Sequence, residues 1–475
     1  MKINPNIIRG YDIRGLVNKD LNEEILENFG KAYGSYMIRH GEYKAIIGHD
    51  SRGDSVAYKD AFIRGLISTG MDVIDMGLIM VGTKYWAQYH FNTKSAIMIT
   101  ASHNPKEFNG MKLAKNYSES MILEDLKSLI RQIETEDFVV AKTAGSIKKI
   151  DITQEYFNDI LQRVKIEKKF KVVVDPSCST PGAIVPNLLR QAGCEVIESN
   201  CNLDPSFPLG VADPTETIVA ERLRDKVLET GADLGFSYDS DGDRIGIVDE
   251  KGTIIWNDVL VALLALDVLN SHPHSKIMFN TLCSKVVSDT IEKYGGEAFM
   301  WRTGHGFLKK KNQEIGAPFI GELSGHFFFS ADFYNHDDGC YVTLRLLEYL
   351  SRTNQSLNQA ISQLPHYISS PEIKLYCDDS KKIALIEKIS PILKNDFKDA
   401  EVIDDERAGD GVRLEMNDSM FIIRYSQNGP YITIKFEAKT EEKYIQLKKY
   451  ISNLLHTFIE IEWDNEIRVN VESLE

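Results

Sequence analysis

The chain has few of the features that mark disulfide-rich, redox, membrane-spanning or exported proteins. Only six cysteines occur among its 475 residues, and none has a spacing typical of a zinc site or a redox couple. The longest apolar run, 259–266, is stopped by Asp267 and is far too short to span a bilayer. The amino-terminal sequence MKINPNIIRGYDIRG has no basic segment followed by an apolar core, as a secretory signal would. We therefore expect a soluble, reduced, cytoplasmic protein.

Positive charge is also in deficit. The sequence has 55 Lys and Arg against 70 Asp and Glu, a formal net charge of -15. This balance argues against nucleic acid or an anionic membrane as the main partner. A chain of this length is too long for one core, which favours three or four domains.

One block of sequence recurs three times: an apolar strand, a polar loop, a helical stretch, then a glycine before a second strand. This spacing is a repeated βαβ pattern, whose right-handed crossovers predict parallel strands in each copy. The first strands include Ile46-Ile47, 172–174 and 277–279, and the second strands follow Gly70, Gly193 and Gly296.

Each copy then supplies another apolar strand that ends in a polar loop. The loops are TASHNP at 100–105, DSDGDR at 239–244 and GELSGH at 321–326. Open α/β sheets bind ligands at the carboxyl ends of their parallel strands. We hypothesise that the three loops face one cleft.

The pattern changes after Leu364, where Pro365 and the stretch 369–371 interrupt it. Residues 420–425 and 431–436 read as strands joined by a turn at 428–430, and a helical stretch follows at 441–459. We expect a smaller α+β domain here, whose turn brings Arg424, Ser426 and Asn428 close together. The expected domains span 1–145, 146–252, 253–366 and 367–475.

Ser102 is the candidate nucleophile of the first loop. An apolar strand delivers it into a turn that Asn104-Pro105 closes, so its hydroxyl is presented to a ligand. The alternative is a serine that caps the next helix. A serine hydrolase is disfavoured because no G-x-S-x-G elbow surrounds Ser102 and because the adjacent His103 is poorly placed to act as its base.

The second loop carries three alternating carboxylates. Asp239, Asp241 and Asp243 can face one side of an extended loop, and three hard oxygens suit magnesium. Glu250 stands at the twelfth position of a calcium EF-hand, but Arg244 occupies the sixth position, which needs glycine, and the flanks read as strands. A solvated acidic turn is the remaining alternative.

These loops, in this order, resemble the α-D-phosphohexomutase superfamily, in particular its phosphomannomutase/phosphoglucomutase branch. YDIRG at 11–15 and RYSQNGP at 424–430 add to the resemblance, which covers nearly the whole chain. It implies an α/β fold with three similar mixed-sheet α/β domains and a smaller α+β C-terminal domain around a central cleft. It also implies transfer of phosphate between O6 and O1 of a hexose, as from mannose 6-phosphate to mannose 1-phosphate, by a monomer or weak homodimer.

The resemblance also implies a role for each residue that matches a motif. Ser102 would carry the phosphoryl group and would bind Mg2+ together with the three aspartates. The sugar hydroxyls would be held by Glu322 and Ser324, with His326 in the same loop. Glucose 1,6-bisphosphate or mannose 1,6-bisphosphate would act as activator. The nonreacting phosphate would be bound by Arg424, Ser426, Gln427 and Asn428, and the cleft would be lined by Arg14, Lys112, Arg244 and His305.

Simpler interpretations of single residues remain: His305 as a structural histidine, Lys112 as a solvated loop lysine, and each arginine as a surface ion pair. The chain also departs from the family. Gln427 and Asn428 replace an Asn and a Thr, and Leu282 stands where related mutases tend to have a lysine, for which Lys285 is a candidate substitute. Phosphoglucosamine mutase, whose sugar loop usually has Gln at Leu323, is the alternative function, followed by a sugar-phosphate phosphatase and a noncatalytic binding protein.

Overall fold

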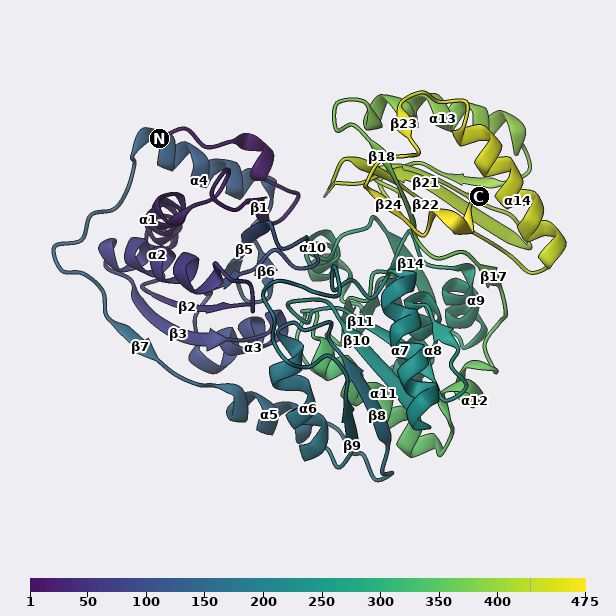
Figure 1. Cartoon of the computed structure of the whole chain (residues 1–475), viewed down its shortest axis with the longest axis horizontal. Helices are drawn as coiled ribbons and strands as arrows, with labels where there is room; N and C mark the ends of the chain where they lie inside the picture. The colour runs from purple at the N-terminus through teal and green to yellow at the C-terminus, as the bar shows by residue number, and fades with distance from the viewer. Residues whose placement is uncertain (428) are drawn as a thin grey trace.

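The computed structural model describes residues 1–427 and 429–475, which form four β-sheets flanked by helices. In Figure 1 the amino-terminal part of the chain lies at one side, the middle part at the centre and the carboxyl-terminal part at the upper right. Among the described residues no helix is both long and apolar enough to cross a membrane. The expected α/β fold with a distinct C-terminal domain is confirmed.

The first sheet has the strand order β1-β5-β4-β2-β3-β7. Its last strand, β7, pairs with β3, so this sheet extends past residue 145. The elements are η1 (Pro5–Ile7), β1 (Ile13–Leu16), α1 (Glu23–Arg39), β2 (Lys44–His49), α2 (Ser55–Ser68), β3 (Asp72–Leu78), α3 (Val81–Phe91), β4 (Ser95–Ile99), β5 (Phe108–Asn116), β6 (Glu119–Ser120), α4 (Leu123–Thr135) and β7 (Ile147–Lys149).

The second sheet has the order β12-β11-β10-β8-β9. Its edge strand β12 pairs with β11, beyond the expected boundary at residue 252. The elements are α5 (Thr153–Leu161), β8 (Lys171–Asp175), α6 (Pro181–Gln191), β9 (Glu195–Glu198), α7 (Thr217–Thr230), β10 (Leu234–Tyr238), β11 (Ile245–Asp249) and β12 (Ile254–Ile255).

The third sheet has the order β14-β13-β15-β16. The apolar run seen in the sequence belongs to α8, whose side chains are buried all round, as expected of a helix that is apolar on every face. The elements are α8 (Asn257–Ser271), β13 (Lys276–Asn280), α9 (Lys285–Lys293), β14 (Glu297–Trp301), α10 (His305–Ile315), β15 (Phe319–Gly321), β16 (Phe327–Phe328), α11 (Gly339–Thr353) and α12 (Leu357–Ile361).

The three sheets share one four-strand pattern. In each, two parallel strands are joined by a helix, a third parallel strand follows on the other side, and a fourth strand returns antiparallel to the third. The returning strand makes the sheets mixed, as the family resemblance implies, whereas the βαβ pattern alone predicts only the parallel part. The three chemically rich loops all connect the third strand to the fourth, so they occupy equivalent positions in the repeats.

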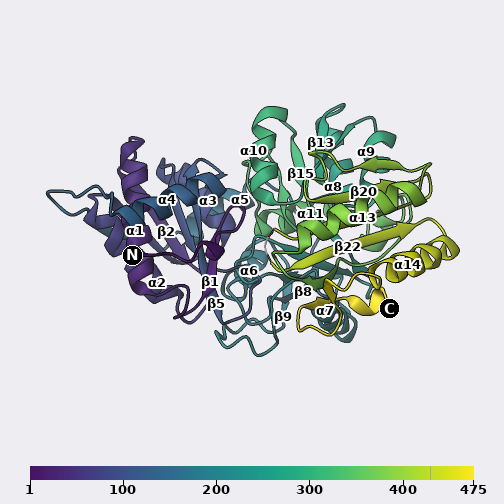
Figure 2. The ribbon, with the colours of Figure 1, turned by 90° about the horizontal axis from the view of Figure 1, so that it is seen from above.

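The C-terminal sheet is antiparallel, with the order β19-β20-β21-β22-β18-β23. Its helices α13 and α14 cover one face, and its other face turns toward the rest of the chain (Figure 2). The predicted helix at 441–459 ends earlier, at Leu455. The elements are β17 (Ile368–Ser369), β18 (Ile373–Cys377), α13 (Lys382–Asp396), β19 (Glu401–Ile403), β20 (Gly411–Glu415), β21 (Ser419–Tyr425), β22 (Tyr431–Ala438), α14 (Glu441–Leu455), β23 (Ile461–Glu462), β24 (Arg468–Val469) and η2 (Val471–Ser473).

The apolar core is divided between these parts of the chain. One cluster of buried side chains runs from α3 through the second and third sheets, whereas the C-terminal sheet has a cluster of its own. Ile422 is the exception, because it lies on the opposite face of β21 and joins the large cluster. The C-terminal domain is thus packed separately and meets the other domains along one face of its sheet.

Candidate active site

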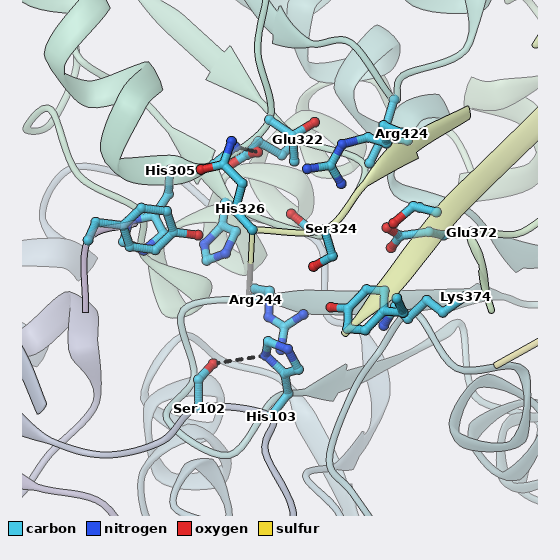
Figure 3. A pocket seen from close by; sticks show the side chains of 18 of the residues that line it. Ser102, His103, Arg244, His305, Glu322, Ser324, His326, Glu372, Lys374 and Arg424 are labelled. Atoms are coloured by element: carbon cyan, nitrogen blue, oxygen red, sulfur yellow. Dashed lines mark hydrogen bonds between the residues drawn. The ribbon is translucent and has the colours of Figure 1, made fainter. Parts of the chain in front are cut away.

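One cavity is lined by residues from all four sheets and their loops (Figure 3). The loops after β4, β10 and β15 all contribute to it, together with the C-terminal strands β18, β21 and β22. Asn428 lies outside the described residues. The sequence-predicted residues that line the cavity are Arg14, Ser102, Lys112, Arg244, His305, Glu322, Ser324, His326, Arg424, Ser426 and Gln427.

Ser102 lies in the turn that follows β4. Its backbone is left-handed, with φ at +49°, a conformation that non-glycine residues adopt rarely and that often marks functional turns. Its hydroxyl donates a hydrogen bond of 2.7 Å to Asp239 Oδ2. The side chain is only 2% exposed, so the hydroxyl is presented to the cavity and is shielded from bulk water.

The His103 ring contacts the Ser102 hydroxyl, although side chains of adjacent residues often point in different directions. Its Nδ1 is 3.3 Å from Ser102 Oγ, because the left-handed turn at Ser102 brings both side chains into the cavity. Burial lowers the pKa of His103 well below its usual range, and the nearby Arg244 lowers it further. The imidazole is therefore neutral at physiological pH.

Arg52, which no sequence motif singled out, shapes the Ser102 loop. Its guanidinium donates to four backbone carbonyls of that loop and of the start of β5, including that of Ser102 at 2.5 Å and that of Asn104 at 2.6 Å. Asp50 holds the guanidinium from behind, at 3.1 Å. One buried cation thus fixes the path of the turn that carries the serine.

Asp239, Asp241 and Asp243 form a buried group directly beside Ser102. Carboxylate oxygens of all three lie within 4.8 Å of one another. Burial raises the pKa of Asp239 to about 8, and the charges of Asp243 and Asp241 raise it too. Asp241 Oδ1 and Asp243 Oδ1 are buried and accept no hydrogen bond from the described residues. This oxygen-rich, unsatisfied set fits a hard divalent cation such as Mg2+.

Cations surround the acidic group. Lys112 Nζ lies 2.5 Å from Asp243 Oδ2 and 2.8 Å from Asp241 Oδ2. Arg244 contacts Asp239 at 3.1 Å and Asp213 at 3.3 Å. Arg14 contacts Asp12 at 2.7 Å and Asn104 Oδ1 at 2.6 Å.

Burial alone would lower the pKa of Lys112, but Asp241 and Asp243 hold it well above its usual value. Lys112 is therefore a buried, charged lysine and not a solvated loop residue.

The third loop supplies Glu322, Ser324 and His326. Glu322 Oε2 accepts the backbone N–H of Gly304 at 3.0 Å, and burial raises the pKa of its carboxyl to about 7. Its Oε1 is buried and has no hydrogen-bond partner within the described part of the chain. That oxygen is therefore available to a polar group of a bound ligand.

Asp337 is a second feature that the sequence motifs did not reveal. Its carboxylate lies 2.7 Å from His326 Nδ1 and 3.6 Å from both His305 Nδ1 and Lys309 Nζ. Burial lowers the pKa of His305 well below its usual range, and Lys309 lowers it further. The two histidine rings stack at 5.0 Å, so Asp337 fixes them as one unit on the cavity wall.

The C-terminal domain contributes Arg424, Ser426 and Gln427. Arg424 is held by two hydrogen bonds of 2.8 and 2.5 Å to the Asp410 carboxylate, and Gln427 donates to the same carboxylate at 3.0 Å. Asp410 therefore presets both side chains. Tyr11, the first residue of the YDIRG motif, also lines the cavity, and so do Glu372, Lys374 and Thr433, which no motif marked. A signal existed for Lys374, since it is a charge between the apolar Ile373 and Leu375 of a strand.

Leu282 lines the cavity and is 1% exposed. Lys285, the candidate to take the place of a lysine at this position, does not line the cavity. It starts α9 and forms an ion pair of 3.2 Å with Glu415 outside the cavity.

Comparison with known proteins places this chain in one family. Models of the Phosphoglucomutase/phosphomannomutase alpha/beta/alpha domains I, II and III match residues 5–140, 154–252 and 256–367. A phosphomannomutase/phosphoglucomutase of Pseudomonas putida is 36% identical over 443 residues, 93% of this chain and 94% of the relative. A phosphoglucomutase/phosphomannomutase of Thermococcus kodakarensis is 31% identical, over 91% of this chain and 94% of the relative.

Solved structures agree with this placement. A phosphoglucomutase/phosphomannomutase family protein of Burkholderia thailandensis superposes with a TM-score of 0.87 at 30% identity, covering 96% of this chain and 98% of that one. The resemblance expected from the five sequence motifs is thereby confirmed. The chain belongs to the phosphoglucomutase/phosphomannomutase family of phosphotransferase enzymes.

Proposed function

We propose that this chain moves phosphate reversibly between O6 and O1 of a hexose, with mannose 6-phosphate and mannose 1-phosphate as one substrate pair and glucose phosphates as another. One observation carries the proposal. The Ser102 hydroxyl, which donates to Asp239 of the buried acidic group, lines the same cavity as Arg424, which Asp410 holds in place. Ser102 and Arg424 come from different domains. A bisphosphorylated hexose has a phosphate at each end, and this cavity offers one group of residues for each phosphate.

Ser102 is the residue proposed to carry the phosphoryl group. In the forward reaction its phosphate passes to the free hydroxyl of the hexose phosphate, and the serine then recovers a phosphoryl group from the other end of the bisphosphate. His103 beside Ser102 is neutral and adds no positive charge. The cations proposed to face the phosphoryl group are Arg14, Lys112 and Arg244, which line the same cavity. Such cations stabilise the charge on the oxygens during in-line transfer.

Asp239, Asp241 and Asp243, together with the Ser102 phosphate, would hold Mg2+. When bound, the ion would neutralise charge on the phosphoryl oxygens. Their fit rests on the unsatisfied Oδ1 atoms of Asp241 and Asp243. Lys112 contacts the carboxylates of Asp241 and Asp243 and also lines the cavity, so its ammonium is available to a phosphate there.

Glu322 and Ser324 are proposed to bind the sugar hydroxyls, and His326 lies beside them. The unpartnered Oε1 of Glu322 suits a hydroxyl donor. Arg424, Ser426, Gln427 and Asn428 are proposed to bind the phosphate that is not reacting. Because Ser102 stays in place, the bisphosphate intermediate must reorient within the cavity so that its other phosphate faces the serine. Added glucose 1,6-bisphosphate or mannose 1,6-bisphosphate would rephosphorylate enzyme that has lost its phosphate.

Assays of the purified protein test this proposal. We expect interconversion of mannose 1-phosphate and mannose 6-phosphate, and of the glucose pair, with much slower conversion of glucosamine 1-phosphate. Release of inorganic phosphate as the main product would instead indicate a phosphatase, and preference for glucosamine 1-phosphate would indicate a phosphoglucosamine mutase. Size-exclusion chromatography tests the further proposal of a monomer or weak homodimer.

A further inference from the structure

Three side chains form a row across the cavity-facing side of the C-terminal sheet. Arg424 on β21 stands directly opposite Thr433 on β22, and Thr433 stands directly opposite Lys374 on β18. All three line the cavity. We call Arg424, Thr433 and Lys374 the C-terminal row. In Figure 3 Lys374 and Arg424 lie along the side formed by the pale yellow strands, whereas Ser102 and His103 lie at the bottom.

Strand alternation explains why the row faces the cavity. Ile373, Leu375 and Ile434 point into the separate core of the C-terminal domain. Successive side chains of a strand point to opposite faces, so Lys374 and Thr433 must turn toward the cavity. Neighbouring strands lie about 4.8 Å apart, which places the backbones of Arg424 and Lys374 roughly 10 Å apart, on either side of Thr433. Two long cationic side chains at that separation can reach one anion between them.

Lys374 is held in place from another domain. Its side chain is 11% exposed, and its Nζ lies 3.3 Å from Asp213 Oδ2. Burial alone would lower the pKa of Lys374, but Asp213 and Glu372 raise it, so the ammonium is charged. Asn470 adds a second link, because its amide donates to the backbone carbonyls of Thr215 and Glu372. The ammonium is therefore fixed at the seam between the second and fourth domains.

Thr433 provides an independent sign that this surface binds a ligand. Thr433 is 0% exposed, yet its hydroxyl makes no hydrogen bond with residues 1–427 or 429–475. A buried hydroxyl without a hydrogen-bond partner destabilises the folded state. A ligand oxygen on the cavity side of β22 would give it one.

Leu282 leaves the loop after β13 without a cation at the cavity. Its apolar side chain lines the cavity, and the nearby Lys285 is engaged with Glu415 outside it. Lys374 is a cation that the fourth domain adds to the cavity wall.

We propose that Lys374 and Thr433 extend the phosphate site of Arg424, so that the C-terminal row binds the phosphate that is not reacting. This inference rests on the proposed phosphohexomutase function. Asp213 contacts both Lys374 and Arg244.

Binding of glucose 1-phosphate to the Ser102→Ala protein, measured by calorimetry, tests the proposal without turnover. Loss of a charge-assisted hydrogen bond corresponds to a weakening of about tenfold or more, and we expect that for Lys374→Met. Adding Leu282→Lys to Lys374→Met should restore most of the lost affinity. Thr433→Val should also bind more weakly, while its melting temperature stays equal or rises because the unpaired hydroxyl is gone.

Lys435→Met is the matched control. Lys435 is a buried lysine of the same domain with an ion pair of 3.0 Å to Asp258 of another domain, but it does not line the cavity. Its loss should leave the affinity for glucose 1-phosphate unchanged. Equal weakening in Lys435→Met and Lys374→Met, with no rescue by Leu282→Lys, would show that Lys374 acts only by joining domains and would overturn the proposal.

The parent protein separates this inference from the proposed function. If Ser102→Ala does not bind glucose 1-phosphate, mannose 1-phosphate or inorganic phosphate, the proposed function is wrong and this inference falls with it. If the parent binds and both Lys374→Met and Thr433→Val bind equally well, only the inference is wrong. Thr433→Val keeps the test decisive if Lys374→Met does not fold.

Discussion

Ser102 Oγ and Asp239 Oδ2 are 2.7 Å apart although 137 positions separate them in the chain. The contact exists because both residues follow the third strand of a repeated sheet, one in the first domain and one in the second. A hydroxyl proposed as phosphoryl carrier and a carboxylate proposed as metal ligand therefore meet where two equivalent loops converge.

Arg52 is predicted to position Ser102. Lysine cannot reproduce the planar set of donors that holds four carbonyls, so Arg52→Lys should lower kcat by about tenfold to a hundredfold, as small misplacements of reacting groups do. Steady-state kinetics and thermal melting check this result. Arg64→Lys, an exposed arginine of the same domain, is the control and should behave as wild type. Unchanged kcat in Arg52→Lys would rule out the positioning role.

Asp241→Asn removes one anionic oxygen from the proposed Mg2+ site. We expect activity to fall by about a hundredfold or more with the fold intact, because the ion would lose both charge and a ligand. EDTA should cause the same loss reversibly, with Mg2+ restoring activity. Asp399→Asn, an exposed aspartate of the C-terminal domain, serves as control. Full activity of the wild-type enzyme in EDTA would contradict the metal assignment.

Glu322 predicts a pH-dependent effect on stability. Burial raises the pKa of its carboxyl from 4.5 to about 7 in the folded protein. Between these values the folded state binds more protons than the unfolded state, so this group's contribution to stability falls as pH rises through that range. Glu322→Gln cannot titrate and escapes the loss, which amounts to roughly 3 kcal/mol at most.

The measurement is the melting temperature of both proteins from pH 4.5 to pH 8. The difference between Glu322→Gln and wild type should move in favour of the variant as pH rises. Glu134→Gln, an exposed glutamate, should show a constant difference. A constant difference for Glu322→Gln as well would mean that the carboxyl titrates normally.

Arg424→Ala should impair the forward and reverse reactions alike, because one arginine serves whichever phosphate is not reacting. We expect kcat/KM to fall about tenfold to a hundredfold in both directions. Escape of the bisphosphate leaves dephosphorylated enzyme, so the variant should need more added glucose 1,6-bisphosphate. A loss confined to one direction at saturating substrate, with the equilibrium constraint accounted for, would argue against a shared phosphate site.

The sequence predicted those parts of the site that local patterns specify. Ser102, the three aspartates and Glu322 each follow an apolar strand, and the repeat places such loops at equivalent ends of similar sheets. The C-terminal strands carrying Arg424 were likewise visible from their alternation. Three short loops and one turn therefore contain nine of the residues that line the cavity.

The residues that were missed act through long-range contacts. Arg52 and Asp337 touch the site only because distant segments fold over them, and neither has a local pattern that separates it from an ordinary surface charge. Lys374 depends on the register of β18 with β22, which the sequence does not fix. The contact between His103 and Ser102 could not be predicted because the left-handed backbone of Ser102 is a property of the folded turn.

Phosphorylation of Ser102 is the central claim, and intact-mass spectrometry after incubation with glucose 1,6-bisphosphate tests it most directly. We expect the wild-type protein to gain one phosphoryl group that peptide mapping assigns to Ser102, and to lose it when glucose 1-phosphate or mannose 1-phosphate is added. Ser102→Ala should gain none and should be inactive. A Ser102→Ala protein with near-normal turnover, or a phosphoryl group at another residue, would contradict the mechanism.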